Sequence, residues 1–485
     1  MDQNMYHCIS YRVAASQRSI DGCESVYNSS MIETSPNPKR SMPRTAGLPL
    51  VGSLPALLRG PFDYMLAAQQ RYGDIYQLRL GLLDLVVCNH PDHLQHILRD
   101  NGRNYRKGGG LWDSIRDLLG NGLPVSEGDF WLRQRRMMQP HFHHQRIAAM
   151  TMLMNDAIST TLAPWDAAAA SGEPLGIVPA LSAITMNVIV RTMFGTSLLP
   201  DEQATVAHSL TYVLDYIMVG VVTHSLPSWL PVPGKRRYRR ELATIDTIID
   251  RVIARCRDSR QDSPPLVALL LDMVDSETGE QMTEQQLRDE VKSIFSAGYE
   301  TTSLALAWAL FHLAQHPATL ETLRSEVDSV LAGREATFAD VARLGYTKMV
   351  VQESMRLYPP VWWLQRTAIN DDELAGYPIK AGTHVACLMY TAHRHPDHWP
   401  EPDRFDPARF RPELAALHHP FAWVPFGGGQ RVCIGRDMAL LEAQLVLSTL
   451  IGRYDLHLAT NDAPQPQLST TLRPKRPLLM TVKRR

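Results

Sequence analysis

One cysteine, Cys433, lies in a loop of unusual glycine density that reads FGGGQRVCIG from 426 to 435. A phosphate-binding loop of the GxxxxGK[ST] type would need a lysine after its glycines, and none follows here. A dinucleotide-binding GxGxxG pattern would need a glycine where Val432 stands. The loop therefore suits neither phosphate nor dinucleotide binding, and its chemistry must come from the thiol.

The residues around this thiol favour a negatively charged sulfur that binds metal. A helix is predicted to start near Ile434, and the free N–H groups and dipole of a helix start stabilise a thiolate. Gly429 and Gly435 leave room for the backbone to wrap around the sulfur of Cys433. Arg431 adds a cation that suits a carboxylate on a bound group. A thiolate held in this way is an electron-rich ligand for haem iron; the plainer alternative is a buried structural cysteine.

A second set of reactive side chains, AGYETT at 297–302, interrupts a long apolar segment. The pattern from 287 to 316 predicts a helix that is apolar on most sides and so crosses the interior. A glycine within a helix and threonines that bond back to a carbonyl permit a local distortion, which is often functional. The alternative is that Glu300 is exposed and Thr301 only packs.

Two shorter patterns place charged or aromatic residues on one helix face. ESMR separates Glu353 from Arg356 by three positions, and WLRQRR separates Trp131 from Arg135 by four. Both spacings bring the two side chains to the same side of a helix. By spacing alone, the first could be an exposed ion pair and the second a basic surface helix.

These residues need a scaffold, and the sequence predicts a mainly helical one. Two short strands are expected at 74–81 and 83–89, joined by a tight turn. Helical patterns then dominate for about 250 residues, strand-like segments follow position 360, and a last helix is expected at 434–452. The first 40 residues are polar and lack the apolar core of a secretory signal. We therefore expect a poorly ordered tail at 1–40 and a single domain at 41–485, whose smaller β-rich part comes from both ends.

Composition excludes several classes of protein. The 49 basic and 50 acidic residues nearly cancel, which argues against a nucleic-acid binder. Six scattered cysteines without a CxxC pair favour a reducing compartment over a disulfide framework or a structural zinc site. No stretch supplies about 20 uninterrupted apolar residues, so a cytoplasmic protein without a membrane anchor is expected. None of the 18 histidines forms a pair whose spacing predicts a metal site.

The cysteine loop resembles the haem-ligand loop of the cytochrome P-450 family. The family pattern FxxGxxxCxG is matched by Phe426, Gly429, Cys433 and Gly435. The pattern [AG]Gx[DE]T of its oxygen-binding helix is matched by Ala297, Gly298, Glu300 and Thr301. The ExxR, WxxxR and PxRF-type patterns also occur in the expected order, and the resemblance runs from about Pro43 to the end of the chain.

The resemblance implies a role for each matching residue. Cys433 would be the axial ligand of the haem iron, while Thr301, with Glu300, would deliver protons to bound dioxygen. Other cofactor-binding residues would be Phe426, Gly435 and Ala297, with Trp131, Arg135, Arg366 and Arg431 at the haem propionates. Glu353, Arg356 and Arg409 would form a buried structural triad that braces the cysteine loop. The fold would place the haem between the long oxygen-binding helix and the helix after the cysteine loop.

The same resemblance implies a substrate pocket assembled from separate segments. The expected lining residues are Leu111, Trp112, Ile217, Phe295, Val361, Trp362, Trp363 and Thr471. Their apolar character favours a hydrophobic small molecule of terpenoid, polyketide or fatty-acyl type. It does not choose among these classes.

The function that the resemblance implies is a haem-thiolate monooxygenase with haem b and dioxygen, active in specialised metabolism. Electrons would come from a separate ferredoxin- or flavodoxin-type protein with its reductase, docking on a surface made basic by Arg133, Arg136 and Arg436. The alternative is that these three are ordinary solvated arginines. The alternatives are a peroxide-driven or isomerising haem-thiolate enzyme and a non-catalytic haem sensor. The Glu300–Thr301 pair argues against the first alternative, and the second lacks any partner-domain feature in the sequence.

Overall fold

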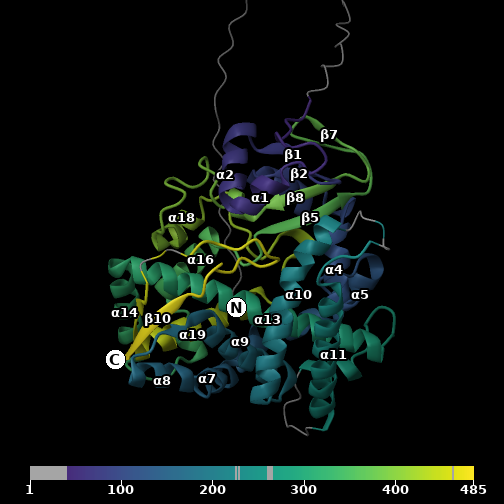
Figure 1. The fold of residues 1–485 in the computed structure, drawn as a ribbon. Coiled ribbons are helices and arrows are strands. Elements are labelled where there is room, and N and C mark those ends of the chain that lie inside the picture. Colours follow the sequence, from purple (N-terminus) through teal and green to yellow (C-terminus); the bar gives the residue numbers. More distant parts are fainter. Residues whose placement is uncertain (1–40, 224–226, 228–229, 259–265, 461, 463) are drawn as a thin grey trace, which may run out of the picture. The chain divides into compact units, whose positions relative to one another are not determined.

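The computed structural model describes residues 41–485 except 224–226, 228–229, 259–265, 461 and 463 (Figure 1). Residues 40–485 form one compact unit. The tail expected at 1–40 lies outside the described residues.

A long central helix, α13 (Glu284–Gln315), organises the helical part of the fold. It begins with a capping box, in which Thr283 and Gln286 satisfy each other's backbone N–H groups. Most of its side chains from Leu287 to Leu313 are buried, as the apolar pattern at 287–316 predicted. Its neighbours are α9 (Ile177–Phe194), α16 (Gly345–Leu357) and α19 (Arg436–Arg453).

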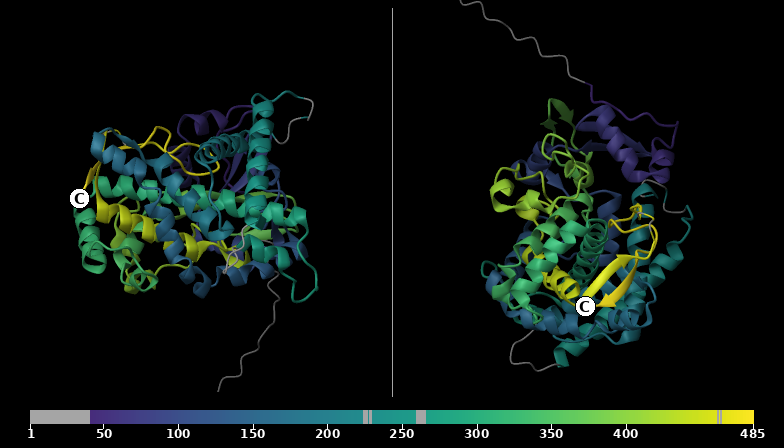
Figure 2. Two further views of the ribbon diagram at one scale, coloured as in Figure 1. Left: turned by 90° about the horizontal axis from the view of Figure 1, so that it is seen from below. Right: turned by 90° about the vertical axis from the view of Figure 1, so that its left-hand side faces the viewer.

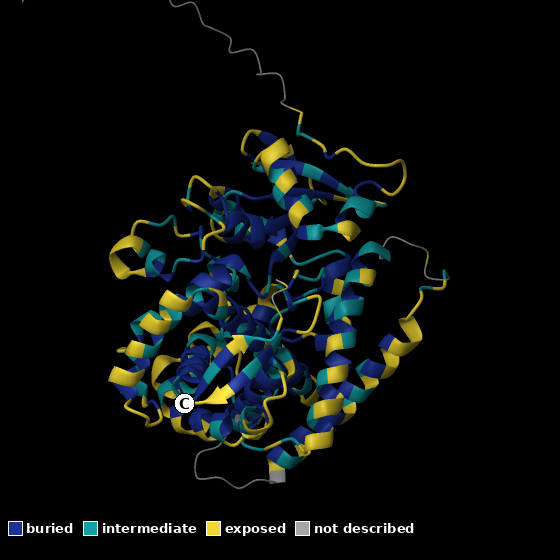
Figure 3. Cartoon of the chain, turned by 60° about the vertical axis from the view of Figure 1, so that its left-hand side comes forward, coloured by how far each residue is buried: buried dark blue, intermediate teal, exposed yellow. Residues whose placement is uncertain are grey.

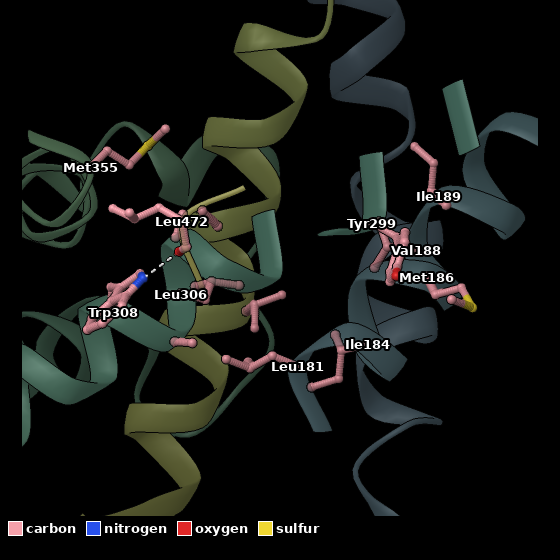
Figure 4. Packing of buried hydrophobic residues seen from close by; sticks show 14 of the residues in the cluster. Leu181, Ile184, Met186, Val188, Ile189, Tyr299, Leu306, Trp308, Met355 and Leu472 are labelled. Atoms are coloured by element: carbon pink, nitrogen blue, oxygen red, sulfur yellow. Dashed lines mark hydrogen bonds between the residues drawn. The ribbon is translucent and has the colours of Figure 1, made fainter. Parts of the chain in front are cut away.

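The contact between α13 and α9 is close-packed. Figure 4 shows Tyr299 of α13 beside Val188 of α9. A Cβ at Gly298 would come within 2.6 Å of Ile189 Cδ1, so only a glycine allows this approach without repacking. Trp308 anchors the other face, because its Nε1 donates to the Leu472 carbonyl at 2.8 Å.

The main sheet joins the N-terminal part of the chain to residues 363–388. Its strand order is β1 (Ile75–Leu80), β2 (Leu83–Cys88), β8 (His384–Leu388), β5 (Trp363–Ala368) and β3 (Tyr105–Arg106). The first two form an antiparallel hairpin, which confirms the strands predicted at 74–81 and 83–89. Strand β8 pairs with β2 in parallel, so Cys88 lies opposite Cys387. The sheet is the upper part of the molecule in Figure 1.

Two smaller sheets complete the β-rich part. One contains β4 (Leu175–Gly176), β10 (Leu479–Arg484) and β9 (Tyr454–Leu458), which lie beside the C-terminus in both views of Figure 2. The other is the hairpin of β6 (Asp372–Leu374) and β7 (Tyr377–Ile379).

The remaining helices cover these elements. In the N-terminal half they are α1 (Leu54–Arg59), α2 (Pro61–Tyr72), α3 (Pro91–Gln95), the π-helix η1 (His96–Asp100), η2 (Gly102–Asn104), α4 (Gly110–Leu119), α5 (Gly128–Met138), η3 (Gln139–Phe142), α6 (His144–Ala149), α7 (Thr151–Ser159), α8 (Ala163–Ser171) and α10 (Pro200–Thr223). In the C-terminal half they are α11 (Lys235–Asp258), α12 (Leu266–Asp272), α14 (Pro317–Leu331), α15 (Phe338–Val341), α17 (Met389–Ala392), η4 (Pro407–Phe410), α18 (Pro412–Ala415) and η5 (Gly429–Arg431).

Burial follows the expected pattern of an apolar interior and polar outer helix faces. The outer helices carry exposed residues on one side and buried residues on the other (Figure 3). By length and composition alone, α9 and α10 could each cross a membrane, but 67% of the relevant window of α9 is buried within the protein. Core helices pass the same test, so these two helices are weak evidence for a membrane span.

Candidate functional site: a thiol-bearing cavity

A cavity of about 390 Å³ brings the two reactive motifs of the sequence together. Cys433 lines it from one segment and Thr301 from α13. Most of the exposed wall is apolar, with contributions from α4, α5, β5 and α19. The arrangement holds a sulfur and a hydroxyl in one enclosed apolar space.

The loop that carries Cys433 is held in place by backbone contacts. Gly429 has a φ of +65°, and a Cβ there would overlap the Leu98 carbonyl of η1, so this position requires glycine. The Cys433 N–H donates to the Phe426 carbonyl at 3.0 Å. On the other side, Arg135 donates to the Val432 carbonyl at 2.9 Å. These bonds fix the direction of the thiol.

Opposing effects act on the Cys433 thiol. The side chain is open to the cavity, while the protein surrounds it elsewhere. Desolvation raises the pKa of this thiol, whereas the Gly435 N–H and the positive charges of Arg135 and Arg436 act to lower it. A cation next to the sulfur, such as a metal ion, would favour the thiolate further.

Four cationic side chains line the same cavity: Lys107, Arg135, Arg366 and Arg431. Arg431 lies 3.7 Å above the Trp131 ring and pairs with Glu127 at 2.6 Å. Within the described part of the chain, the other three have no carboxylate partner within 4 Å. Desolvation lowers the pKa of Arg366, and it lowers the pKa of Lys107 well below its usual value with help from Arg366 and Arg431. Buried cations without counter-ions indicate that this wall receives an anionic group.

These donors fit a haem. The thiol of Cys433 can bind iron, the cationic wall suits two propionates, and the apolar walls suit the porphyrin. Sequence analysis found Arg135, Arg366 and Arg431 for this wall but missed Lys107. In the sequence, Lys107 stands out only because it comes directly before three glycines at 108–110, the last of which begins α4.

A sequence model of the cytochrome P-450 family matches residues 42–482. The chain belongs to the cytochrome P-450 family. Its fold agrees, because a crystal structure of the cytochrome P-450DA heme domain superposes with a TM-score of 0.83, at 27% identity over 92% of this chain and 98% of that one.

Curated relatives of this cytochrome P-450 include bacterial oxygenases. Cyclooctatin synthase and cyclooctat-9-en-7-ol 5-monooxygenase, both from Streptomyces melanosporofaciens, are 36% identical; they cover 89% and 84% of this chain and 93% and 88% of their own lengths. Pentalenene oxygenase from Streptomyces avermitilis is 30% identical over 88% of this chain and 94% of its own. The protein is thus a cytochrome P-450 monooxygenase.

In this cytochrome P-450, the two polar residues predicted for α13 point to different surroundings. Thr301 lines the cavity, and its Oγ1 donates to the Ala297 carbonyl at 2.8 Å. Glu300 is absent from the cavity wall. It pairs with Arg473 and accepts a hydrogen bond from Thr471 Oγ1 at 3.0 Å. Desolvation raises the pKa of Glu300, which Arg473 and Thr471 counteract.

The expected distortion of α13 is not present, since 284–315 is α-helical throughout. The link from Glu300 to the cavity runs through Thr471, which does line the wall. Arg473 also lies 3.6 Å from Asp215, whose side chain is 37% exposed. Glu300 therefore belongs to a chain of polar groups between the cavity and the surface, and not to the wall itself.

The predicted triad of this cytochrome P-450 is assembled in the interior. Glu353 and Arg356 are fully buried and form two hydrogen bonds of 2.7 and 2.9 Å. Arg409 lies 3.5 Å from Glu353 as an ion pair and donates to the Glu401 carbonyl. Arg356 donates further to the carbonyls of His393, Pro402 and Arg404. These added bonds satisfy a guanidinium that would be costly to bury otherwise.

The brace reaches the cysteine loop through a residue that sequence analysis did not single out. His393, whose carbonyl accepts from Arg356, uses its ring Nε2 to accept the Val424 N–H at 2.9 Å. Val424 directly precedes the turn at residues 425–426, where the loop that carries Cys433 begins. The pair Glu353–Arg356 is thereby connected to the loop that positions the thiol.

Two buried carboxyl groups at the cavity were also missed. Glu290 of α13 accepts the Leu123 N–H at 3.0 Å, and desolvation raises its pKa to about 8. Glu442 of α19 is 2% exposed, and desolvation raises its pKa well above the usual value despite a hydrogen bond with Thr302. No spacing in the sequence distinguishes either residue from a surface glutamate.

Of the eight residues expected in the substrate pocket, five line the cavity and three do not. Leu111, Trp112, Val361, Trp363 and Thr471 line the cavity. Ile217, Phe295 and Trp362 do not, and they pack in the core instead. Trp362 donates to the Ser469 carbonyl at 2.8 Å and contacts Phe62 edge to face. Its ring also stacks on that of Trp363, with the centroids 5.4 Å apart, so Trp363 lies on the cavity wall and Trp362 lies in the core.

Each arginine of the expected basic docking surface has an acidic neighbour in the structure. Arg133 pairs with Glu280, Arg136 with Asp275 and Glu277, and Arg436 with Asp437. That these three arginines form the docking surface of the redox partner stays a prediction.

Proposed function

We propose that this enzyme hydroxylates a terpenoid, namely an olefinic hydrocarbon or an alcohol derived from one. The names of its relatives, cyclooctat-9-en-7-ol 5-monooxygenase and pentalenene oxygenase, support this substrate class. The observation that carries the proposal is that Cys433 and Thr301 face one apolar cavity. Ile115, Ile189 and Ile294 on its wall offer an unreactive surface to a hydrocarbon.

We infer roles for the residues of the site from these contacts. Cys433 binds the iron of haem b, and Lys107, Arg135, Arg366 and Arg431 bind the propionates together with Trp131. The haem, when bound, supplies the activation of dioxygen. Thr301 holds a hydroxyl at the cavity and hands on protons, while Glu300 orients Thr471 and receives protons from the side of Asp215. The apolar wall keeps bulk water from the reacting atoms.

We further propose that electrons come from a separate ferredoxin- or flavodoxin-type protein. Because Arg133, Arg136 and Arg436 each face a carboxylate, we expect them to contribute little electrostatic steering. We place the enzyme in the cytoplasm. In support, Cys88 and Cys387 lie opposite each other on adjacent strands and are free thiols, as in a reducing compartment.

The proposal is tested by spectroscopy and turnover with defined probes. Pentalenene and cyclooctat-9-en-7-ol are titrated into the haem-loaded enzyme, and a low- to high-spin change of the haem spectrum is expected. Turnover is then measured in two reactions, one with NADPH, ferredoxin and reductase and the other with hydrogen peroxide alone. An oxygenated product that needs the electron donor supports a monooxygenase acting on terpenoids. Product that forms with peroxide but not with the electron donor, or a rearranged product without added oxygen, overturns the mechanism. No spectral response to either probe overturns the substrate class.

A second measurement tests the iron ligand independently of the substrate. Cys433→Ser should lose the thiolate-type carbon monoxide spectrum while the fold remains. If this spectrum is unchanged, another residue binds the iron.

A further inference from the structure

Five histidines gather in one place outside the cavity: His90, His93, His395, His398 and His419. The ring centroids of His90 and His395 are 4.8 Å apart, and those of His90 and His398 are 5.1 Å apart. His93 lies 5.5 Å from His90, and His419 lies 5.6 Å from His398. None of the five lines the cavity. This cluster is formed by the start of α3, the segment after α17, and the turn that follows α18.

We propose that His90, His395 and His398 bind a divalent transition-metal ion, with zinc as the expected occupant. One ring nitrogen of each lies within 4.8 Å of those of the other two. His90 Nε2 and His398 Nε2 are 3.4 Å apart. Two nitrogens that bind one tetrahedral zinc ion at about 2.0–2.1 Å are themselves about 3.4 Å apart. This pair already has the spacing that the ion requires, and the third imidazole needs a small approach.

Carboxylates lie behind two of the three imidazoles. His395 Nε2 is 2.9 Å from Asp74 Oδ1, so a hydrogen on Nε2 leaves Nδ1 free to bind an ion. That Nδ1 now accepts only a long 3.3 Å bond from the Asp397 N–H. Histidines that bind metal usually donate their other N–H to a carboxylate in this manner, which fixes the ring and increases its basicity.

A carboxylate also lies next to His90, and an ion on this ring would change the hydrogen bond between them. Its Nδ1 accepts the Asp92 N–H at 3.1 Å, and the Asp92 carboxylate lies 3.5 Å from the same nitrogen. When Nε2 binds an ion, Nδ1 carries the hydrogen and can donate it to that carboxylate. Among the described residues, one hydrogen bond joins two rings of the cluster directly, that between His90 and His398, and His419 Nε2 lies 3.1 Å from Asp92 Oδ1.

The positions of the three histidines allow entry of an ion without loss of rigidity. His90 precedes the first turn of α3, and His395 is 6% exposed with its carbonyl bonded to the Trp399 N–H. His90 and His398 are partly exposed, so an ion can reach them from solvent and keep a water as fourth ligand. The buried Nδ1 of His93 has no hydrogen-bond partner among the described residues, so this nitrogen is a further candidate ligand.

An ion at this place would join two parts of the fold. It would connect the segment after β2 to the segment after α17, which also contains His393. Because His393 links Arg356 to Val424, the ion would stabilise the same segment that supports the cysteine loop. Binding to the folded state alone raises the unfolding midpoint.

The test uses haem-loaded enzyme without a histidine tag, freed of loose metal with a chelator and dialysed. Zinc is titrated by calorimetry, and retained zinc is counted by mass spectrometry. We expect one zinc per chain in addition to the haem iron, together with a higher unfolding midpoint. His398→Gln should weaken zinc binding at least about tenfold. The matched control is His143→Gln in the exposed segment at 141–144, which should bind zinc like the unchanged enzyme.

The carbon monoxide spectrum shows in each case whether the haem site is intact. Asp74→Asn serves as a second variant, because it keeps all three imidazoles and should weaken binding by about 10- to 100-fold. Loss of zinc with an unchanged carbon monoxide spectrum supports the site. Absence of stoichiometric zinc in the unchanged enzyme overturns it, as does zinc binding in His398→Gln and Asp74→Asn that is as tight as in the unchanged enzyme.

Discussion

The side chains of the cavity leave its wall positively charged, because its guanidinium groups stay ionised while burial favours the neutral form of its carboxyl groups. Arg366 is buried without a carboxylate partner among the described residues, and a guanidinium keeps its charge at neutral pH. Glu290 and Glu442 are also buried, and desolvation raises the pKa of each, to about 8 for Glu290, which favours the neutral carboxyl form. Neutral carboxyl groups do not compensate the cations. The wall therefore keeps its attraction for the carboxylates of a bound group.

Thr301→Ala should separate oxygen consumption from product formation. The substitution removes the hydroxyl at the cavity but no haem contact, so the haem content should stay the same. Without that hydroxyl, proton delivery should fail and reducing equivalents should appear as hydrogen peroxide. The measurement is the ratio of product and peroxide to NADPH consumed. Thr301→Ser is the matched control and should keep coupling, whereas unchanged coupling in the alanine variant would exclude Thr301 from proton delivery.

Glu290→Gln should stabilise the protein more at pH 7.5 than at pH 5. The folded-state pKa of about 8 lies above the usual value of 4.5. Between these values the unfolded chain loses the proton and the folded chain keeps it. The free energy of unfolding that Glu290 contributes below pH 4.5 is thus lost as the pH rises, by at most about 1.4 kcal/mol per pH unit. Glutamine keeps an acceptor for the Leu123 N–H and does not titrate.

Urea unfolding midpoints of Glu290→Gln and the unchanged enzyme at the two pH values measure this effect. The control is Glu413→Gln on α18, which removes an exposed carboxylate instead of a buried one. Parallel pH profiles for Glu290→Gln and the unchanged enzyme would contradict the raised pKa.

At the scale of elements, the cysteine loop depends on a contact with a short π-helix. The Leu98 carbonyl of η1 occupies the space in which a side chain at position 429 would lie. π-helical turns are rare and often occur near functional sites. Here the turn positions a backbone carbonyl against the loop, so the loop is supported from the N-terminal part of the chain as well as by α5.

Gly429→Ala should lower haem occupancy more than Gly427→Ala does. Both glycines have positive φ, +65° and +72°, so both substitutions cost about 1–2 kcal/mol of backbone strain. Only at Gly429 would the new Cβ also overlap a backbone carbonyl, because at Gly427 the nearest atom is Leu364 Cδ1 at 3.6 Å. The ratio of haem to protein absorbance measures occupancy. Equal losses in the two variants would show that the contact with η1 is unimportant.

Across the whole molecule, the buried pair Glu353–Arg356 connects segments that are remote in sequence. It joins α16 to the carbonyls of residues 393–404 and, through His393, to the start of the cysteine loop. The sheet makes a comparable connection, since β2 near the N-terminus pairs with β8. The haem-binding half of the fold is therefore held by long-range contacts.

Glu353→Gln should destabilise the fold by about 3–5 kcal/mol, because it leaves the buried Arg356 without a counter-ion. The control is Glu401→Gln, which removes the acid of an exposed pair with Arg404 that has the same three-residue spacing. Exposed pairs contribute about 0–1 kcal/mol, so this change should be small. Unfolding midpoints and haem retention are measured for both. Similar losses would contradict a special role for burial.

Several features of the site could be read directly from the sequence. Cys433 with its glycines, Thr301 and the pair Glu353–Arg356 belong to short patterns, because a loop or one helix turn fixes their relative positions. The fold class and the first two strands followed from periodicity in the same way. Side-chain direction was harder: on α13, Ile294, Ala297 and Thr301 line the cavity, while Phe295, one position further round the helix, turns into the core.

The tertiary structure alone decided which remote residues meet. Lys107 and Glu442 reach the cavity from segments more than 300 positions apart, and His90 meets His398 across 308 positions. No spacing predicts such meetings, since they depend on how helices and sheets pack. The sequence by itself determined the haem-thiolate chemistry, because that chemistry is encoded in local loops and turns. The charge of the wall, the link from Glu300 to the surface and the histidine cluster arise only when the chain is folded.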